Sequence, residues 1–190
     1  MDLRLNWHQW QSLGSMETKE FICGYCGKDV ATQHGYHHNQ GSRIFICPNC
    51  GLPSFFHSAI QSPGPMMGRD VQGLPHDIEA VYKEIRDTAK GGSLTAAILL
   101  GRKLIMHIAV GAGAEEGKSF KQYIDYLAKE HYIPPKASKL LDYMRELGNE
   151  KNHEIKLGTP EEVQRLVKFV ESLLYFVYEL EAEFPEKTEE

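Results

Sequence analysis

Apolar residues follow a helical period through the second half of the chain. Between about residues 75 and 90 they recur at Ile78, Val81, Tyr82 and Ile85, the i, i+3, i+4, i+7 spacing of an amphipathic helix. Further helices are predicted at about 93–110, 119–131, 137–153 and 160–184. The second is apolar nearly all round, so we expect it in the middle of a bundle. Short connections between about five helices predict largely antiparallel neighbours.

Glycine and proline separate this helical half from an N-terminal part with strand-forming residues. Residues 61–75 contain six Gly or Pro, which predicts a linker. Before it, Phe21-Ile22 and Arg43-Ile44-Phe45-Ile46 are β-formers and predict two strands. Residues 1–20 carry two Trp among polar residues, a pattern compatible with either a short strand or a loosely packed arm.

Four cysteines form two C-x2-C pairs, Cys23/Cys26 and Cys47/Cys50, separated by twenty residues. This is the spacing of a structural zinc site with four thiolate ligands. Each pair is followed by Gly (Gly27, Gly51), which allows the positive φ that such a turn needs. Strands leading into each turn make this segment a predicted zinc ribbon. Four thiolates leave no open position on the metal, so we expect a structural ion.

Three histidines lie between the two cysteine pairs, and any of them is a possible substitute ligand. With four Cys present, we expect His34, His37 and His38 to be exposed loop residues instead. The predicted fold class is therefore α+β and mostly α, with a small β zinc ribbon before an antiparallel helical bundle. The expected segments are an arm (1–20), the ribbon (21–60), the linker (61–75), the bundle (76–184) and an acidic tail (185–190).

Composition and charge narrow the class of protein. The sequence is 42% hydrophobic and 25% charged, as in soluble globular proteins, and no apolar run approaches the ~20 residues that a bilayer requires. The N-terminus has no signal-peptide pattern, so we expect a cytoplasmic protein without membrane contact. Net charge is −5, and residues 179–190 contribute six Glu against one Lys. The remainder sums to about zero, which disfavours a general nucleic-acid binder.

One cluster of polar residues borders the apolar stripe of the fourth helix. On a continuous helix, Arg145, Asn149 and Asn152 fall within ~60° of one another, and His153 lies ~40° further round. These residues are candidates for a ligand pocket or a catalytic site. Alternatively, Gly148-Asn149 forms a helix C-cap that scatters the cluster. Arg102, on the second helix, is a further pocket candidate.

These motifs together resemble a known family. The chain has Gly148-Asn149 between Arg145 and His153, preceded by the segment 92–102 and followed by the capping box Thr159-Pro160-Glu161-Glu162. Over about residues 74–184 it resembles the bacterial domain of unknown function 4145, which is placed in the HEPN superfamily. An N-terminal zinc ribbon is a familiar companion of that domain.

The resemblance implies a helical bundle that often dimerises and that occurs in restriction, toxin–antitoxin and anti-phage settings. Many HEPN proteins are metal-independent ribonucleases that use an Arg, a polar neighbour and a His four to six residues later. Here seven residues separate Arg145 from His153, and Glu146 follows the Arg. This departure argues against hydrolysis of RNA.

The sequence therefore favours a non-catalytic binding or regulatory protein in bacterial or phage defence or restriction. Its expected partners are another protein or a second copy of the chain, with a nucleotide or RNA also compatible. The alternative is a dimeric, metal-independent ribonuclease that uses Arg145, Asn149 and His153. A third hypothesis is that the ribbon binds nucleic acid through Lys28, Arg43 and nearby aromatic residues.

Overall fold

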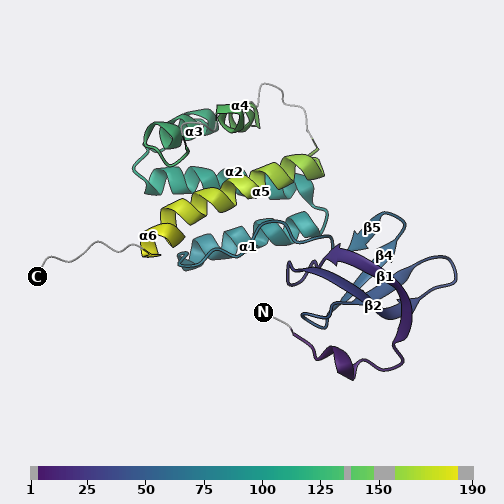
Figure 1. Cartoon of the computed structure of the whole chain (residues 1–190). Helices are drawn as coiled ribbons and strands as arrows, with labels where there is room; N and C mark the ends of the chain where they lie inside the picture. The colour runs from purple at the N-terminus through teal and green to yellow at the C-terminus, as the bar shows by residue number, and fades with distance from the viewer. Residues whose placement is uncertain (1–3, 135–137, 148–156, 184–190) are drawn as a thin grey trace, which may run out of the picture. The chain divides into compact units, whose positions relative to one another are not determined.

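The structure is a computed structural model of the 190-residue chain, and it describes residues 4–134, 138–147 and 157–183. The chain divides into two compact units. The first comprises Met1–Met67 with Asp87–Ser93, and the second comprises Gly68–Arg86 with Leu94–Glu190. We call them the β unit and the helical unit. The α+β class predicted from the sequence is confirmed, with the sheet N-terminal to the helices (Figure 1).

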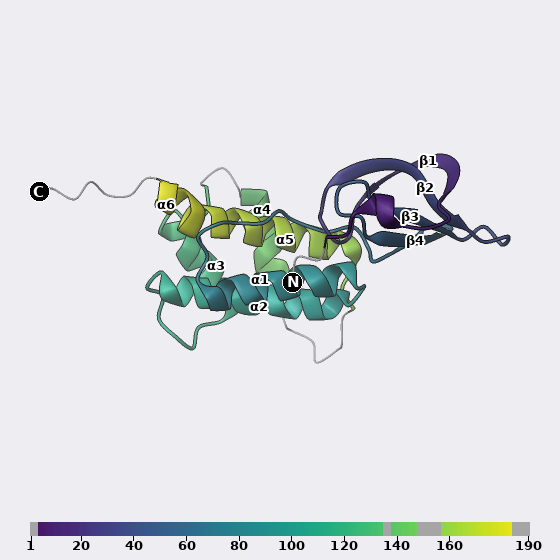
Figure 2. The same cartoon turned by 90° about the horizontal axis from the view of Figure 1, so that it is seen from below.

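The β unit is an antiparallel meander in which each strand pairs with the next along the chain. Its strands are β1 (Gly14–Ile22), β2 (Asp29–His37), β3 (Arg43–Ile46), β4 (Pro53–His57) and β5 (Ile60–Ser62), preceded by the 3-10 turn η1 (Trp7–Gln9). The strand predicted at 43–46 is β3. β1 begins inside the range 1–20 that was expected to form an arm. The long strands β1 and β2 curve strongly along their length (Figure 2).

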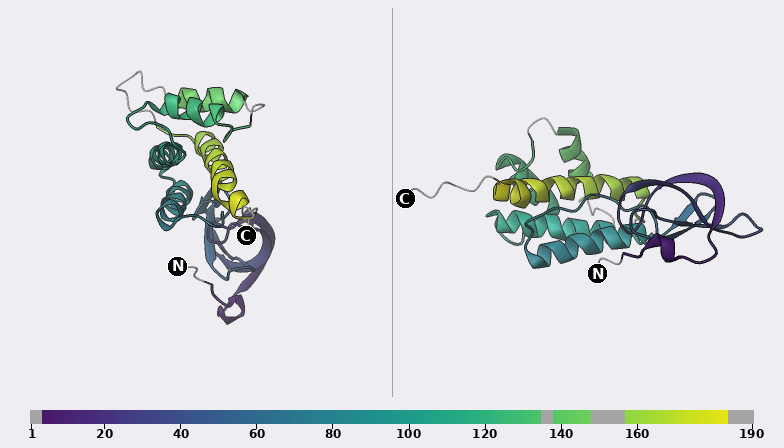
Figure 3. Two further views of the ribbon diagram at one scale, coloured as in Figure 1. Left: turned by 90° about the vertical axis from the view of Figure 1, so that its left-hand side faces the viewer. Right: turned by 60° about the horizontal axis from the view of Figure 1, so that its bottom comes forward.

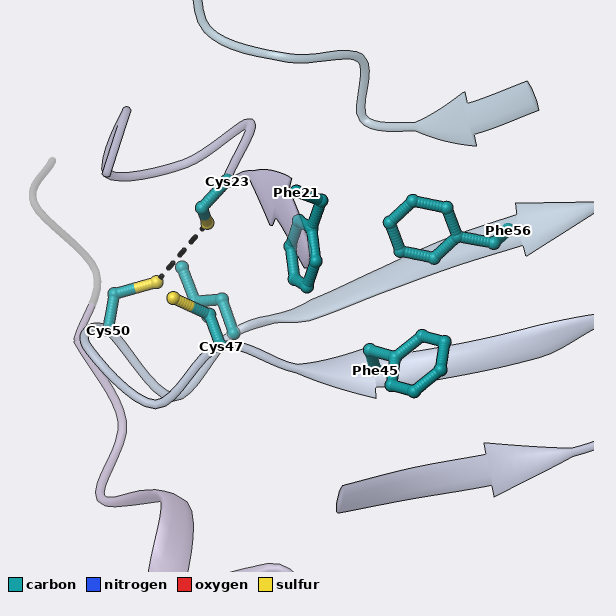
Figure 4. Packing of buried hydrophobic residues seen from close by; sticks show 7 residues of the cluster. Phe21, Cys23, Phe45, Cys47, Cys50 and Phe56 are labelled. Carbon is teal, nitrogen blue, oxygen red and sulfur yellow. Dashed lines mark hydrogen bonds between the residues drawn. The ribbon is translucent and has the colours of Figure 1, made fainter. Parts of the chain in front are cut away.

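Aromatic rings fill the core of the β unit beside the cysteines. Phe56 makes edge contacts with Phe21 at 5.1 Å and with Phe45 at 5.7 Å between ring centroids. All three rings belong to one buried cluster that also contains Cys23, Cys47, Cys50 and Leu52 (Figure 4). Curvature brings β5 back towards β1, where the Gln61 side chain donates a hydrogen bond to the Ile22 carbonyl at 2.8 Å. Packing of the aromatic rings thus forms most of this small core, and the cysteine side chains form its remaining edge.

The helical unit contains the helices predicted from the hydrophobic period, except that the last turn of α1 (residues 87–90) belongs to the β unit. They are α1 (His76–Lys90), α2 (Leu94–Gly111), α3 (Phe120–Lys129), α4 (Ser138–Leu147), α5 (Pro160–Leu174), a π-helical segment η2 (Tyr175–Glu179) and α6 (Leu180–Glu183). Ser119 and Thr159 begin α3 and α5 with complete capping boxes, which satisfy amide donors of the first turn. The predicted last helix is therefore three consecutive helical segments.

The helices of this unit are not all antiparallel neighbours. α1 and α2 form an antiparallel pair, whereas α5 runs in the same direction as α2 (Figure 1). Seen along α1 and α2, the pair α3 and α4 runs across their direction (Figure 3, left).

α2 is the central helix, as its apolar composition predicts. It packs against α5 and α3 and buries Ala97, Gly101, Leu104, Ile105, Ile108 and Ala109. Among the described residues it is the one helix whose length and composition would allow it to cross a membrane. Core helices of soluble proteins share these properties.

Part of the predicted linker is held against the π-helical segment by an ion pair and hydrogen bonds. Arg69 pairs with Glu179 at 3.0 Å and lies over the ring of Tyr175 at 5.1 Å, and the Gln72 amide donates to Glu179 at 2.8 Å. The buried Tyr82 hydroxyl of α1 donates to the Arg69 carbonyl at 3.0 Å. These contacts connect α1 to the π-helical segment.

Candidate metal centre and the Arg145 cluster

The four cysteines converge at one end of the β unit. Cys23 and Cys26 lie in the turn between β1 and β2, and Cys47 and Cys50 lie in the turn between β3 and β4. Their four sulfurs all lie within 4.8 Å of one another. Figure 4 shows three of them pointing towards a common point next to the core rings.

The two turns have the same backbone geometry. In each, the first Cys amide donates to the carbonyl five residues on, and the Gly amide donates back to the first Cys carbonyl. The bonds are Cys23 to Lys28 at 2.9 Å, Gly27 to Cys23 at 2.9 Å, Cys47 to Leu52 at 3.0 Å and Gly51 to Cys47 at 2.8 Å. Gly27 and Gly51 have φ of +65° and +72°, which confirms the positive φ predicted from sequence.

The sulfur separations fit a tetrahedral metal ion. Cys23 Sγ lies 3.7 Å from Cys50 Sγ, and Cys26 Sγ lies 3.8 Å from Cys47 Sγ. Four sulfurs at the zinc–thiolate bond length form a tetrahedron with edges of about 3.8 Å. A disulfide requires a separation of about 2 Å, so none of the pairs is joined. The donor set and its spacing are therefore those of a four-thiolate metal site.

Burial raises the pKa of two of the four thiols. It raises the pKa of Cys47 to about 11 and raises the pKa of Cys50 still more strongly. At Cys26, burial acts in the same direction, but hydrogen bonds from the Lys28 amide and the Asn49 side chain outweigh it and lower the pKa. Without a metal, Cys47 and Cys50 therefore keep their protons at neutral pH, and a metal has to displace those protons to bind.

The histidines between the pairs lie elsewhere. His34 and His37 are in strand β2, so the expectation that they are loop residues was wrong for these two. The ring of His34 stacks on Trp7 with centroids 5.3 Å apart. Within the described residues, the four cysteines form the one group of three or more side chains that could hold a metal ion.

The N-terminal segment covers the second cysteine turn, a contact that sequence reasoning missed. The Leu5 amide donates to the Cys50 carbonyl, and the Trp10 indole N–H donates to the Gly51 carbonyl, both at 2.8 Å. A Cβ on Gly51 would lie 2.0 Å from the Leu5 carbonyl oxygen. Residues 5–10 are therefore part of the β unit.

Arg145 lies in α4 and is held by two carboxylates. Its Nη2 and Nε lie 2.6 Å and 2.7 Å from Asp125 Oδ1, and its Nη1 lies 2.9 Å from Asp142 Oδ1. Its side chain is 34% exposed. Hydrogen bonding to Asp125 raises the pKa of Arg145. The guanidinium thus carries one positive charge among two negative ones.

Of the other pocket candidates, Arg102 is the one that falls within the described residues. Arg102 of α2 lies over the ring of Phe120 at 5.1 Å, at the start of α3, whereas Arg145 contacts Asp125 further along that helix. Asn149, Asn152 and His153 lie outside the described residues. The polar partners of Arg145 could not be found from local spacing, because Asp125 is twenty residues away.

Comparison with known proteins identifies the helical part. A family profile described as Domain of unknown function (DUF4145) matches residues 83–190, which is more than half of the 190-residue chain. No curated protein and no solved structure matches the sequence. The matched range starts within α1 and includes the helix that carries Arg145. The chain belongs to the family of proteins with a DUF4145 domain.

Proposed function

We propose that this protein is a zinc-ribbon binding or regulatory protein with a HEPN-like helical bundle, and that it does not act as a nuclease. The proposal places it in the bacterial cytoplasm, in a defence or restriction setting, acting through a protein partner or a second copy of the chain. The proposal has a structural half, the zinc site, and a functional half, the lack of nuclease activity, and different residues support each.

Zinc is the metal that suits the cysteine site best. Four thiolates with tetrahedral separations are the preferred ligands of a structural zinc ion, and they leave no position for water or substrate. Bound there, zinc would cross-link the two turns and hold one end of the small aromatic core. Cys23, Cys26, Cys47 and Cys50 would be its ligands, and its contribution would be to folding rather than to catalysis.

The ion pairs of Arg145 carry the functional half of the proposal. A metal-independent ribonuclease needs a cation that is available to the phosphate in the transition state. Arg145 already donates to Asp125 and Asp142 at 2.6–2.9 Å, so a phosphate would have to displace one carboxylate and approach the other. That local field disfavours RNA.

The test is a cleavage assay with mixed RNA in the presence of a chelator. We expect no cleavage by the parent protein, and none by Arg145→Ala or His153→Ala. Arg165→Ala is the matched control. Arg165 is an exposed arginine of α5 whose guanidinium lies over the ring of Tyr143, and it is not one of the candidate site residues. Cleavage by the parent and the control that disappears in both site variants would overturn the proposal and establish the ribonuclease alternative.

The metal is tested separately, by elemental analysis of protein purified without chelator. One zinc per chain is expected. Less than about half an ion per chain of any metal would contradict the ribbon assignment.

A further inference from the structure

The C-terminal end of α1 depends on a contact from outside the helix. The last four carbonyls of an α-helix have no partner within it. In α1 the turn that follows supplies three donors: Gly91 to Asp87 at 3.1 Å, Gly92 to Ala89 at 3.1 Å and Ser93 to Thr88 at 2.9 Å. The fourth carbonyl, that of Lys90, accepts from the Gly64 amide at 2.9 Å.

Gly64 in turn rests on the first cysteine turn. A Cβ on Gly24 would lie 2.3 Å from the Gly64 carbonyl oxygen, and a Cβ on Gly64 would lie 2.7 Å from the Lys90 carbonyl oxygen. Three backbone segments therefore touch in a row, with no room for a side chain between them. All three belong to the β unit.

Side chains from the same turn strengthen this arrangement. The Lys90 ammonium lies 6.0 Å from the centre of the Tyr25 ring, within the range of a cation–π contact, and it also pairs with Asp87 at 2.6 Å. Tyr25 lies between the two cysteines of the first turn. The turn thus contacts the end of α1 through a side chain as well as through Gly64.

From these contacts we propose that metal binding at the four cysteines controls the stability of the last turn of α1. The inference rests on the proposed metal site. With an ion bound to Cys23 and Cys26, the position of Gly24 is fixed, and Gly64 is held against the Lys90 carbonyl. Without the ion, the turn keeps its two backbone hydrogen bonds but loses the cross-link to Cys47 and Cys50.

The consequence reaches the family domain. The matched range begins at residue 83, so the turn at 87–93 is part of it. The metal site lies before that range in sequence, yet it supports the last turn of α1, which lies within the range. The site therefore acts as a metal-dependent clasp on the end of α1.

Hydrogen exchange of the full-length protein, followed by mass spectrometry, tests this inference. The zinc-loaded parent is compared with chelator-treated parent. We expect the amides of Gly91, Gly92 and Ser93 to exchange at least about tenfold faster without zinc, since their protection reports the opening of this turn. Peptides from α5 should exchange at the same rate in both states.

A pair of glycine variants separates the clasp from general loosening of the β unit. Gly64→Ala should keep one zinc per chain, yet exchange at 91–93 as fast as the metal-free parent. Gly111→Ala is the control, because a Cβ there meets no atom within 4 Å, and it should behave as the parent does. If Gly64→Ala does not fold, the comparison of the parent with and without zinc decides the question.

Two failures are distinguishable. Unchanged exchange at 91–93 in a protein that demonstrably binds and releases zinc overturns the clasp and leaves the metal site intact. A parent protein that binds no metal overturns the proposed site and the clasp together.

Discussion

At the scale of single residues, charge is balanced in opposite ways at the two sites. As thiolates, the four cysteine sulfurs would bring negative charge into a largely buried space, where a bound cation would compensate it; without a cation, Cys47 and Cys50 avoid this charge by keeping their protons. Arg145 brings one positive charge to a partly exposed surface and already has two carboxylates at hydrogen-bond distance. The charge at the cysteines therefore depends on whether a cation binds there, whereas the charge of Arg145 is paired within the protein itself.

The metal site predicts a large effect from a very small change. Cys50→Ser replaces one thiolate with a hydroxyl that binds zinc poorly, and zinc supplies roughly 10 kcal/mol or more to small zinc-folded domains. We expect bound zinc to fall below half an ion per chain and the β unit to lose several kcal/mol of stability. The measurements are elemental analysis and urea unfolding.

His37→Ala is the matched control for this substitution. The side chain is exposed and lies in β2, away from the sulfurs, so the variant should bind zinc and unfold as the parent does. Retention of one zinc per chain by Cys50→Ser would contradict the four-ligand assignment.

Tyr82 gives a prediction about alkaline pH. Burial raises the pKa of this phenol, which is 2% exposed. The folded state therefore holds the proton at a pH where the unfolded chain loses it, so the stability is present below about pH 10 and is lost as pH rises further. We expect the unfolding free energy of the helical unit to fall above pH 10 by up to about 1.4 kcal/mol per pH unit from this group.

Tyr82→Phe should remove the part of the fall in unfolding free energy above pH 10 that comes from this phenol. It should also cost about 1 kcal/mol at neutral pH, because the hydrogen bond to the Arg69 carbonyl is lost. Urea unfolding followed by circular dichroism between pH 8 and 11 measures both effects. An equal alkaline slope in the variant would show that Tyr82 is not its source.

Sequence reasoning at this scale succeeded where a residue's role is set by its neighbours in the chain. The four ligand candidates and the positive φ of Gly27 and Gly51 follow from local spacing. The strand position of His34 and the carboxylate partners of Arg145 do not, because both depend on which segments meet in three dimensions. The same holds for the contact between Gly64 and Lys90.

At the scale of elements, the hydrophobic period is sufficient to locate the helices. α1 begins at His76 and α2 at Leu94, each within one residue of the position expected from proline, glycine and serine signals. The three-residue strand β5 is too short to show any pattern, and the curvature of β1 obscures its alternation. The crossing of α3 and α4 over α2 is a property of packing that a helical period does not contain.

The contact between α2 and α5 predicts opposite effects at two glycines of α2. A Cβ on Gly101 would lie 2.6 Å from Leu166 Cδ2, and Leu166 is fully buried. Overpacking costs about 1–3 kcal/mol, which exceeds the gain of about 1 kcal/mol from replacing Gly by Ala in a helix. Gly101→Ala should therefore destabilise the helical unit by up to about 2 kcal/mol.

Gly111→Ala should instead be neutral or slightly stabilising, since no atom lies within 4 Å of its Cβ. Urea midpoints from circular dichroism at 222 nm compare the two variants. A shift of both midpoints in the same direction would contradict close packing of α2 on α5 at Gly101.

At the scale of the whole molecule, charge and domain division set limits on function. The net charge of −5 gives no excess of cations for counterion release, so binding to nucleic acid would have to come from a local patch. The cysteines and both Trp residues lie in the β unit, while nearly all of the α-helix lies in the helical unit. Each unit therefore has its own spectroscopic signal.

Removal of the metal should consequently separate the two signals. The Trp10 indole donates to the carbonyl of Gly51, the residue after Cys50, and Trp7 stacks on His34. When a strong chelator takes the ion, the second cysteine turn loosens and both indoles become more exposed to water. We expect the Trp emission to shift to longer wavelength while most of the ellipticity at 222 nm persists. The reason is that the cores of α2, α3 and α5 contain no metal ligand. Addition of zinc should reverse the shift.

Equal and simultaneous loss of both signals would mean that the helices cannot fold without the metal. The ribbon would then be a folding requirement for the DUF4145 domain rather than a separately stabilised unit.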